Sequence, residues 1–414
     1  MSIPPELGMN ALNPFGSYWT RYPEAVSNND YFVNLILNNC SRMRCITKTN
    51  ELTETADNPG GSQGAAPAHR YWVSSVKAAN PSFPILYGID NGGSVKYYPP
   101  HHSFYRSRLL IEAAWAEANH MDGFAVGVEH EVAHASGSNL VTVATLTRSS
   151  NVVTATFATP HGFTTGQEIT VSGASPSTFN VADSITSPTN VIVTVIDSTT
   201  LTYPNIGADE SATGTLKMGW SYHQERSMIK ADAAAAQAIF SGYLTYCCSQ
   251  GYEQGWINDG ITPGTNLDKI GFNIYGDVGN DNWTTFKSHL DTCWNAFGTN
   301  MILAEMNASD PGTWNNTSIS GITPSSTAFY KLWEDELVRR FNYAKSLGLE
   351  QIFIYTAWDI ENKFSLFYNE GSQNGQPTST LFLDALFSGS FLPVVDRLCN
   401  RRSSSIFLGS MESQ

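Results

Sequence analysis

The 414-residue sequence is short of charge, and of positive charge above all, because 23 Lys and Arg stand against 37 Asp and Glu and leave a formal net charge of −14. Affinity for nucleic acid comes chiefly from cations that neutralise phosphates, so this balance disfavours a nucleic-acid partner. Charged residues make up only 14% of the chain and hydrophobic residues 41%. A large core can therefore be buried, and general disorder is not expected.

Long apolar runs are also missing. No stretch of 18 or more apolar residues could span a bilayer. The first residues lack the basic-then-apolar pattern of a signal peptide. We expect no membrane insertion, and the chain is either given in its mature form or exported by a route that needs no such peptide.

Motifs that hold metals or nucleotides are absent as well. The six cysteines show no paired C-x-x-C spacing, the nine histidines form no H-E-x-x-H, and no G-x-G-x-x-G follows the first predicted strand. These spacings mark common zinc and dinucleotide sites. We predict no metal and no organic cofactor, and expect reduced, mostly buried thiols.

Two kinds of sequence alternate along the chain. Residues 1–138 and 219–400 mix short apolar runs with helix-like segments, whereas residues 139–218 are rich in Thr, Ser and Val and almost free of Lys and Arg. Five runs of β-branched residues separated by turn signals lie in the second kind, at 141–146, 152–157, 168–171, 191–196 and 200–203. This pattern predicts a small all-β domain inserted into a discontinuous host, with a tail at 401–414.

Outside the insert, apolar strands alternate with helices. The predicted strands are 7–12, 43–47, 84–89, 124–128, 254–258, 269–275, 301–305 and 351–356. The predicted helices are 31–41, 68–79, 103–120, 227–249, 283–297, 327–347 and 380–387. Short apolar strands joined by helical crossovers are typical of parallel sheets. We therefore predict an α/β fold, a (β/α)₈ TIM barrel, with an open doubly wound sheet as the alternative.

Two carboxylates stand at the ends of predicted strands, where the functional side chains of a parallel barrel lie. Glu129 directly follows the apolar run 124–128, and Glu305 ends the run 301–305. An ionised carboxylate at the edge of a core costs free energy unless it is paired or used. Each could cap a helix or pair with Arg44 or Arg226, but together, at strands four and seven, they predict a catalytic pair.

Further polar or aromatic residues at or near predicted strand ends are candidates for substrate-binding or supporting roles. They are Arg44, Asp90, Asn91, His130, Glu131, Asn258, Asp259, Tyr275 and Trp358.

The order of these residues resembles the large clan of retaining glycoside hydrolases with (β/α)₈ barrels, which place an acid/base Glu after strand four and a nucleophile Glu after strand seven. Gly127–Glu129 is similar to the clan's Gly-Asn-Glu, and Ile-Leu-Ala-Glu305 to its strand-seven motif. The resemblance implies that Arg44 and Tyr275 contact the nucleophile and that Trp358 floors the sugar subsite. It implies a glycosidase that cleaves a poly- or oligosaccharide by double displacement.

Val128 departs from the clan's pattern, because it stands where the clan has the Asn that binds the sugar 2-hydroxyl. The change fits an unusual substrate, a weakened enzyme, or a shifted register in which Glu131 is the acid. We favour Glu129 because it ends the apolar run. The alternative function is a catalytically inactive barrel that serves as a carbohydrate-binding or structural component.

The insert carries a second resemblance, in the run Ala158–Val171, which contains Thr-Pro-His-Gly-Phe, and in Asp197–Tyr203. These runs are similar to a small β-rich repeat of bacteriophage tail and virion-associated proteins. The resemblance implies a glycan depolymerase on a phage particle, with other tail proteins as possible partners. We therefore expect an extracellular or virion-associated place of action after cytoplasmic synthesis.

Overall fold

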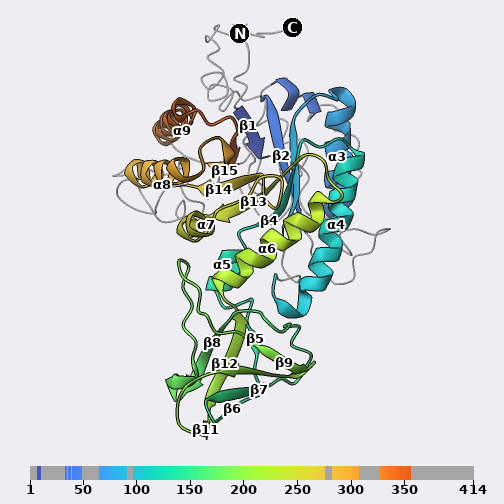
Figure 1. Ribbon diagram of the computed structural model, residues 1–414. Helices are drawn as coiled ribbons and strands as arrows, with labels where there is room; N and C mark the ends of the chain where they lie inside the picture. The colour runs from blue at the N-terminus through green and yellow to red at the C-terminus, as the bar shows by residue number, and fades with distance from the viewer. Residues whose placement is uncertain are drawn as a thin grey trace, which may run out of the picture.

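The computed structural model describes residues 7–10, 33–34, 36–38, 40–48, 65–90, 97–275, 282–306 and 327–355. Eight parallel strands close into a barrel in the order β1-β16-β15-β14-β13-β4-β3-β2 (Figure 1). The strands are β1 Leu7–Asn10, β2 Arg42–Lys48, β3 Ile85–Asp90, β4 Gly123–Val128, β13 Tyr243–Ser249, β14 Lys269–Ile274, β15 Met301–Met306 and β16 Ile352–Tyr355. The predicted TIM barrel is confirmed, and closure excludes the open sheet.

Helices surround this barrel and connect its strands. They are α3 Ala65–Ala79, η3 Pro99–His101, α4 His102–Ala118, α5 His130–Ala135, α6 Tyr222–Gln237, α7 Glu253–Asp259, α8 Asn282–Phe297, η5 Gly298–Asn300 and α9 Thr327–Leu347. Seven predicted strands fall within two residues of observed ones. Residues 33–34 and 36–38 are helical, as expected for 31–41. The predicted helix 380–387 lies outside the described residues.

The fifth strand was wrongly predicted. Residues 254–258 belong to helix α7, and the fifth strand is β13, which the sequence analysis assigned to the end of a helix at 227–249. The Ala-rich centre of α6 favours helix, but this helix ends at Gln237, before Ser241-Gly242. The aromatic and Thr residues of Tyr-Leu-Thr-Tyr that follow favour a strand. Asn258 and Asp259 therefore do not end a barrel strand.

The inward-facing side chains of the barrel strands form a buried apolar core. This core is formed by Ile46, Leu86, Ala125, Val128, Cys247, Ile302, Ala304 and Phe353. A Cβ on Gly8 would lie 2.5 Å from the Phe353 ring, and one on Gly88 would lie 2.5 Å from Ala125 Cβ. Because this interior is full, large polar side chains can gather only toward the barrel's end, as is typical of TIM barrels.

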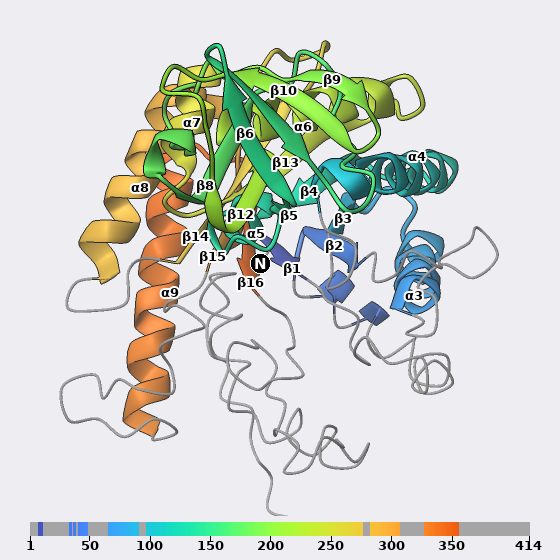
Figure 2. The same ribbon diagram turned by 90° about the horizontal axis from the view of Figure 1, so that it is seen from below.

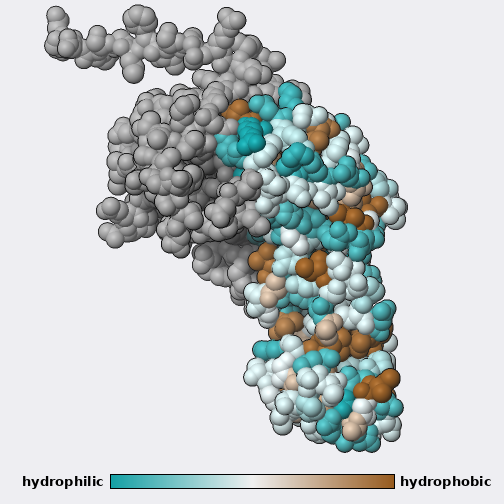
Figure 3. Space-filling model, turned by 90° about the vertical axis from the view of Figure 1, so that its left-hand side faces the viewer, coloured by the Kyte–Doolittle hydropathy of each residue, from teal (hydrophilic) through white to brown (hydrophobic). Residues whose placement is uncertain are grey.

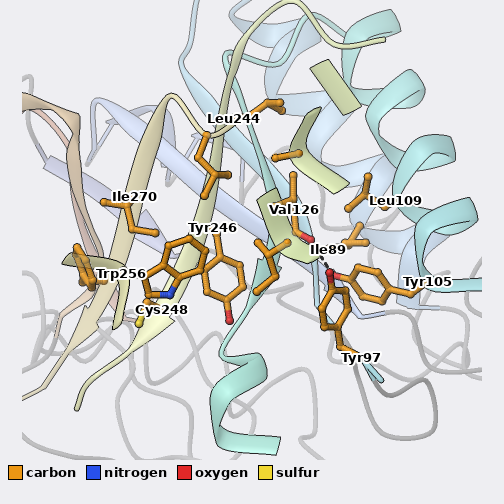
Figure 4. Close-up of a cluster of buried hydrophobic side chains, with 14 of the residues drawn as sticks. Ile89, Tyr97, Tyr105, Leu109, Val126, Leu244, Tyr246, Cys248, Trp256 and Ile270 are labelled. Carbon is orange, nitrogen blue, oxygen red and sulfur yellow. Dashed lines mark hydrogen bonds between the residues drawn. The ribbon is translucent and has the colours of Figure 1, made fainter. Parts of the chain in front are cut away.

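The outer faces of the strands pack against the helices. Leu244, Tyr246 and Cys248 alternate along β13 with the inward Cys247, as the two-residue period of a strand requires (Figure 4). The rings of Tyr246 and Trp256 of α7 lie 5.1 Å apart. Cysteines 40, 45, 247, 248 and 293 are all free and buried, which confirms the expected burial of these thiols.

The insert is an all-β domain, as predicted, and leaves the barrel after α5. Its strands are β5 Val141–Thr142, β6 Thr145–Ser149, β7 Val152–Thr156, β8 Ile169–Ser175, β9 Thr194–Asp197, β10 Thr200–Pro204, β11 Glu210–Ser211 and β12 Thr213–Trp220. They form an antiparallel five-stranded sheet, β11-β6-β7-β10-β9, and a three-stranded sheet, β5-β12-β8. Figure 2, viewed from the insert's side, shows these strands in front of the barrel.

The insert forms a separate lobe (Figure 3), but polar contacts fix it to α5, α6 and α7. Asp183 accepts from His134 of α5 at 2.7 Å, and Glu168 pairs with His223 of α6 at 2.7 Å. Asn258 of α7 donates to the Thr186 carbonyl at 2.9 Å. Several side chains therefore set the insert's orientation on the barrel.

The Thr-Pro-His-Gly-Phe run builds a turn and touches the barrel. His161 Nδ1 accepts from the Phe163 N–H at 3.0 Å, and Gly162 has a φ of +72°. A Cβ on Gly162 would lie 2.4 Å from the backbone of Pro99 in η3. The motif thus has a structural role, because only glycine fits this close approach.

Among the described residues no helix is both long and apolar enough to cross a membrane.

We predict that deleting residues 139–218 and joining the ends with a short Gly/Ser linker leaves a folded barrel. Val141 and Met218 pair directly, so the chain enters and leaves the insert at neighbouring points. The lost contacts at the interface contribute about 1 kcal/mol each, so the melting temperature should fall by a few degrees. Circular dichroism should still show a cooperative transition. A deletion protein that is only insoluble would show that the insert completes the barrel core.

Candidate active site

Two glutamates lie at the carboxyl ends of opposed parts of the barrel. Glu305 is the fifth of six residues in β15 and is 8% exposed. Glu129 directly follows β4, caps α5 and is partly exposed. The negative charge of Glu305 raises the pKa of the Glu129 carboxyl. The two predicted catalytic residues therefore share one electrostatic environment at the barrel mouth.

Glu305 is held by a cation and a hydroxyl from two other strands. Arg44 Nη1, from β2, lies 2.6 Å from Glu305 Oε1, and the Arg44 side chain is almost fully buried. The hydroxyl of Tyr275, directly after β14, donates to Glu305 Oε2. A buried charge needs a partner of opposite sign, so Arg44 and Glu305 stabilise each other. The structure thus brings Arg44 and Tyr275 to Glu305.

Unlike Glu305, which pairs with Arg44, Glu129 has no cation beside it in the described structure. Burial and, next, the negative charge of Glu305 together raise the pKa of Glu129 to about 7, although a hydrogen bond from Asn273 opposes the rise. Asn273 Nδ2 donates to Glu129 Oε1 at 2.9 Å. A substantial fraction of Glu129 is therefore protonated at neutral pH, as a general acid requires.

Asn273 is a site residue that the sequence analysis missed. It lies in β14, directly opposite Glu305 in the strand pairing, and is fully buried. Its Oδ1 has no hydrogen-bond partner among the described residues. The available signal was an amide inside the buried run Ile-Gly-Phe-Asn-Ile, because a buried polar group needs a partner.

His130 and Glu131 begin α5 and are buried among aromatic side chains. The His130 ring is buried and stacks on Tyr97 with centroids 4.2 Å apart, and burial lowers its pKa to about 3. Glu131 accepts from Tyr246 at 2.7 Å and from Trp256 at 3.0 Å. Burial raises the pKa of Glu131 to about 6, and both hydrogen bonds oppose the rise.

The remaining candidates separate into three groups. Asp90 ends β3, and its charge adds to the rise in the pKa of Glu129, which places it near the mouth. Asn258 contacts the insert, and Asp259 pairs with Arg226 of α6 at 2.7 Å, so both serve the helix layer. Their expected place at the end of strand five is wrong. Asn91 and Trp358 lie outside the described residues.

The arrangement supplies an acid and a nucleophile or base without further groups. Glu305 is a carboxylate balanced by Arg44, while Glu129 carries a proton up to about neutral pH. Pairs of carboxyl groups whose environments separate their pKa values are used for acid–base and nucleophilic chemistry. Within the described ranges, no group of three or more His, Cys, Asp or Glu side chains could hold a metal ion.

We predict that Asn273→Ala raises the pKa of Glu129 above about 7, because it removes the hydrogen bond that opposes the rise. Titration of the labelled carboxyl carbon by ¹³C NMR, assigned with Glu129→Gln, measures this pKa directly. Asn180→Ala, which removes an amide inside the insert, is the matched control and should leave it unchanged. An equal or lower pKa in Asn273→Ala would refute the role of this hydrogen bond.

Comparison with known proteins gives structural neighbours only. No protein-family model matches the chain, and no curated protein matches it. A Bacteroides ovatus GH5 xyloglucanase is 11% identical with a TM-score of 0.45, covering 94% of this chain and 74% of its own. A GH113 β-mannanase from Alicyclobacillus acidocaldarius is 9% identical with a TM-score of 0.44, covering 94% and 98%. An Ignisphaera aggregans GH53 catalytic domain is 13% identical with a TM-score of 0.43, covering 91% and 98%.

Proposed function

We propose that the protein is a retaining glycoside hydrolase that cleaves a poly- or oligosaccharide, with Glu305 as nucleophile and Glu129 as acid/base. The observation that carries this proposal is the contrast between the two carboxyl groups at one barrel mouth. Arg44 and Tyr275 surround Glu305, whereas burial and the charge of Glu305 raise the pKa of Glu129 to about 7. Double displacement needs this combination.

The first chemical step uses both groups at once. A Glu305 oxygen attacks the anomeric carbon, the glycosidic C–O bond breaks, and the leaving oxygen takes the proton of Glu129. The products are a covalent glycosyl ester on Glu305 and an ionised Glu129. The hydroxyl of Tyr275 and the guanidinium of Arg44 hold the attacking carboxylate in place before this step.

The second step reverses the roles. Glu129 accepts a proton from water, the water oxygen attacks the anomeric carbon, and the Glu305 carboxylate leaves. Esterification removes the charge of Glu305, which was one cause of the high pKa of Glu129. The pKa of Glu129 therefore falls in the intermediate, so the same group becomes a carboxylate that can act as base.

The Val128 side chain packs with the inner apolar lining of the barrel. It offers no amide for a sugar hydroxyl. Asn273, whose Nδ2 donates to Glu129, is the buried amide at this site and holds the acid/base instead.

We predict that Glu129→Gln and Glu305→Gln each lower kcat at least about 10³-fold, which corresponds to about 4 kcal/mol of barrier. A screen of chromogenic aryl glycosides and polysaccharides identifies the substrate on which kcat is then measured. Asp259→Asn, which alters a carboxylate of the helix layer, is the matched control and should stay active. Sugar binding without turnover by the intact protein would instead support the inactive, carbohydrate-binding alternative.

We predict retention of the anomeric configuration. A 2-deoxy-2-fluoro glycoside of the hydrolysed sugar, with an activated leaving group, should label Glu305, and mass spectrometry of the peptides should locate the ester. In a crystal of this adduct the carboxyl groups of Glu129 and Glu305 should lie about 5–5.5 Å apart. An inverted product seen by ¹H NMR, with a separation of about 6.5–9.5 Å, would contradict the double displacement.

We further propose, from the sequence motif of the insert alone, that the protein acts outside the cell on a phage particle against a bacterial surface glycan. The motif's described side chains are used in the turn and in contacts with the barrel. Detection of the chain in purified virions by mass spectrometry tests this location.

A further inference from the structure

The backbone at Glu129 is in an unusual conformation. Its φ of 51° and ψ of 37° lie in the left-handed region, although it is not glycine. Such a conformation is strained for a residue with a Cβ and persists where the surroundings hold it, most often at functional sites. The direction of the Glu129 side chain therefore depends on whatever fixes its two peptide groups.

Two hydrogen bonds hold these peptide groups against β13. The Glu129 N–H donates to the Cys247 carbonyl at 2.9 Å. The next N–H along the chain, that of His130, donates to the hydroxyl of Tyr246 at 2.8 Å. The first is an ordinary backbone contact between neighbouring strands, but the second depends on one side chain.

The hydroxyl of Tyr246 has a fixed orientation. It donates its proton to Glu131 Oε2 at 2.7 Å, which leaves its lone pairs for the His130 N–H. Glu131 is itself fixed through Oε1 by the indole N–H of Trp256 at 3.0 Å. Tyr246 is fully buried, and its ring packs beside that of Trp256 (Figure 4).

We infer that Tyr246, oriented by Glu131, is a positioning residue that holds Glu129 in its left-handed conformation and so directs the acid/base carboxyl at the glycosidic oxygen. This inference rests on the proposed function, because it assigns Glu129 the acid/base role. It also gives Glu131 a purpose that does not require contact with substrate. Loss of the Tyr246 hydroxyl should let the peptide after Glu129 relax and misdirect the acid.

The experiment compares substrates that need a proton with one that does not. The dinitrophenolate group of a dinitrophenyl glycoside leaves without protonation. The leaving group of an alkyl or phenyl glycoside of the same sugar must be protonated by the general acid. The quantity measured is kcat/KM, which reports the glycosylation step. Tyr246→Phe should lose at least about tenfold more kcat/KM on the poor leaving group than on the activated one.

Tyr105→Phe is the matched control. Tyr105 is also a fully buried tyrosine, and its hydroxyl donates to the Val126 carbonyl of β4 at 2.8 Å, so both variants lose one buried hydroxyl near the same strand. A purely structural loss should lower kcat/KM on both substrates by the same factor. We expect that pattern for Tyr105→Phe and not for Tyr246→Phe.

Glu131→Gln is the second variant and keeps the inference testable if Tyr246→Phe does not fold. It retains the Tyr246 hydroxyl but weakens the acceptor that orients it, so the same dependence on leaving group should appear with a smaller factor. Equal losses on both substrates in Glu131→Gln and in any folded Tyr246→Phe would overturn the inference.

Glu129→Gln separates this outcome from failure of the proposed function. If that variant shows no dependence on leaving group, Glu129 is not the acid and the proposed function fails. If Glu129→Gln shows the dependence while Tyr246→Phe follows Tyr105→Phe, the proposed function stands and the positioning role is wrong.

Discussion

The ion pair between Arg44 and Glu305 fixes a negative charge at the barrel mouth. A guanidinium on β2 that is almost fully buried must be balanced, and Glu305 of β15 lies 2.6 Å away to do so. The pair lies toward the end of the barrel, because buried apolar side chains, Phe353 among them, occupy its interior. The fixed negative charge of Glu305 then acts on Glu129, whose pKa burial has already raised. One ion pair thus produces two carboxyl groups of different character.

Further polar contacts hold Glu129 and the peptide that follows it. Asn273 reaches Glu129 from β14, and Tyr246 reaches the adjoining peptide from β13. Each contact comes from a strand next to, or one removed from, β4 in the sheet order. The closed barrel is what makes this possible, because residues far apart in the sequence meet at neighbouring strand ends.

Much of the architecture could be predicted from the sequence, because strands buried on both faces leave a clear apolar signal. Glu129 and Glu305 stood out for the same reason, since each interrupts or ends such a run. The fifth strand could not be separated from α6, because Ala-rich helix and apolar strand meet with only Ser241-Gly242 between them. That error carried Asn258 and Asp259 into the predicted site.

Sequence patterns could not predict the directions of the side chains at the site. His130 and Glu131 follow Glu129 directly, yet the left-handed turn and the start of α5 send them into the buried layer against Tyr97 and Tyr246. Asn273 was missed because a single amide in a strand does not reveal its partner 144 residues away. Tertiary contacts, and not local preference, decide these positions.

The insert also has a consequence for how the barrel assembles. It lies within residues 129–242, the connection between β4 and β13, which pair side by side. With the insert, the connection is roughly three times as long, which for an unfolded chain would add about 1 kcal/mol to the entropy cost of closing this loop. Val141 and Met218 pair, so a folded insert brings its two ends together and shortens the effective connection. An insert that folds first would therefore let β4 and β13 meet about as fast as in a barrel without it.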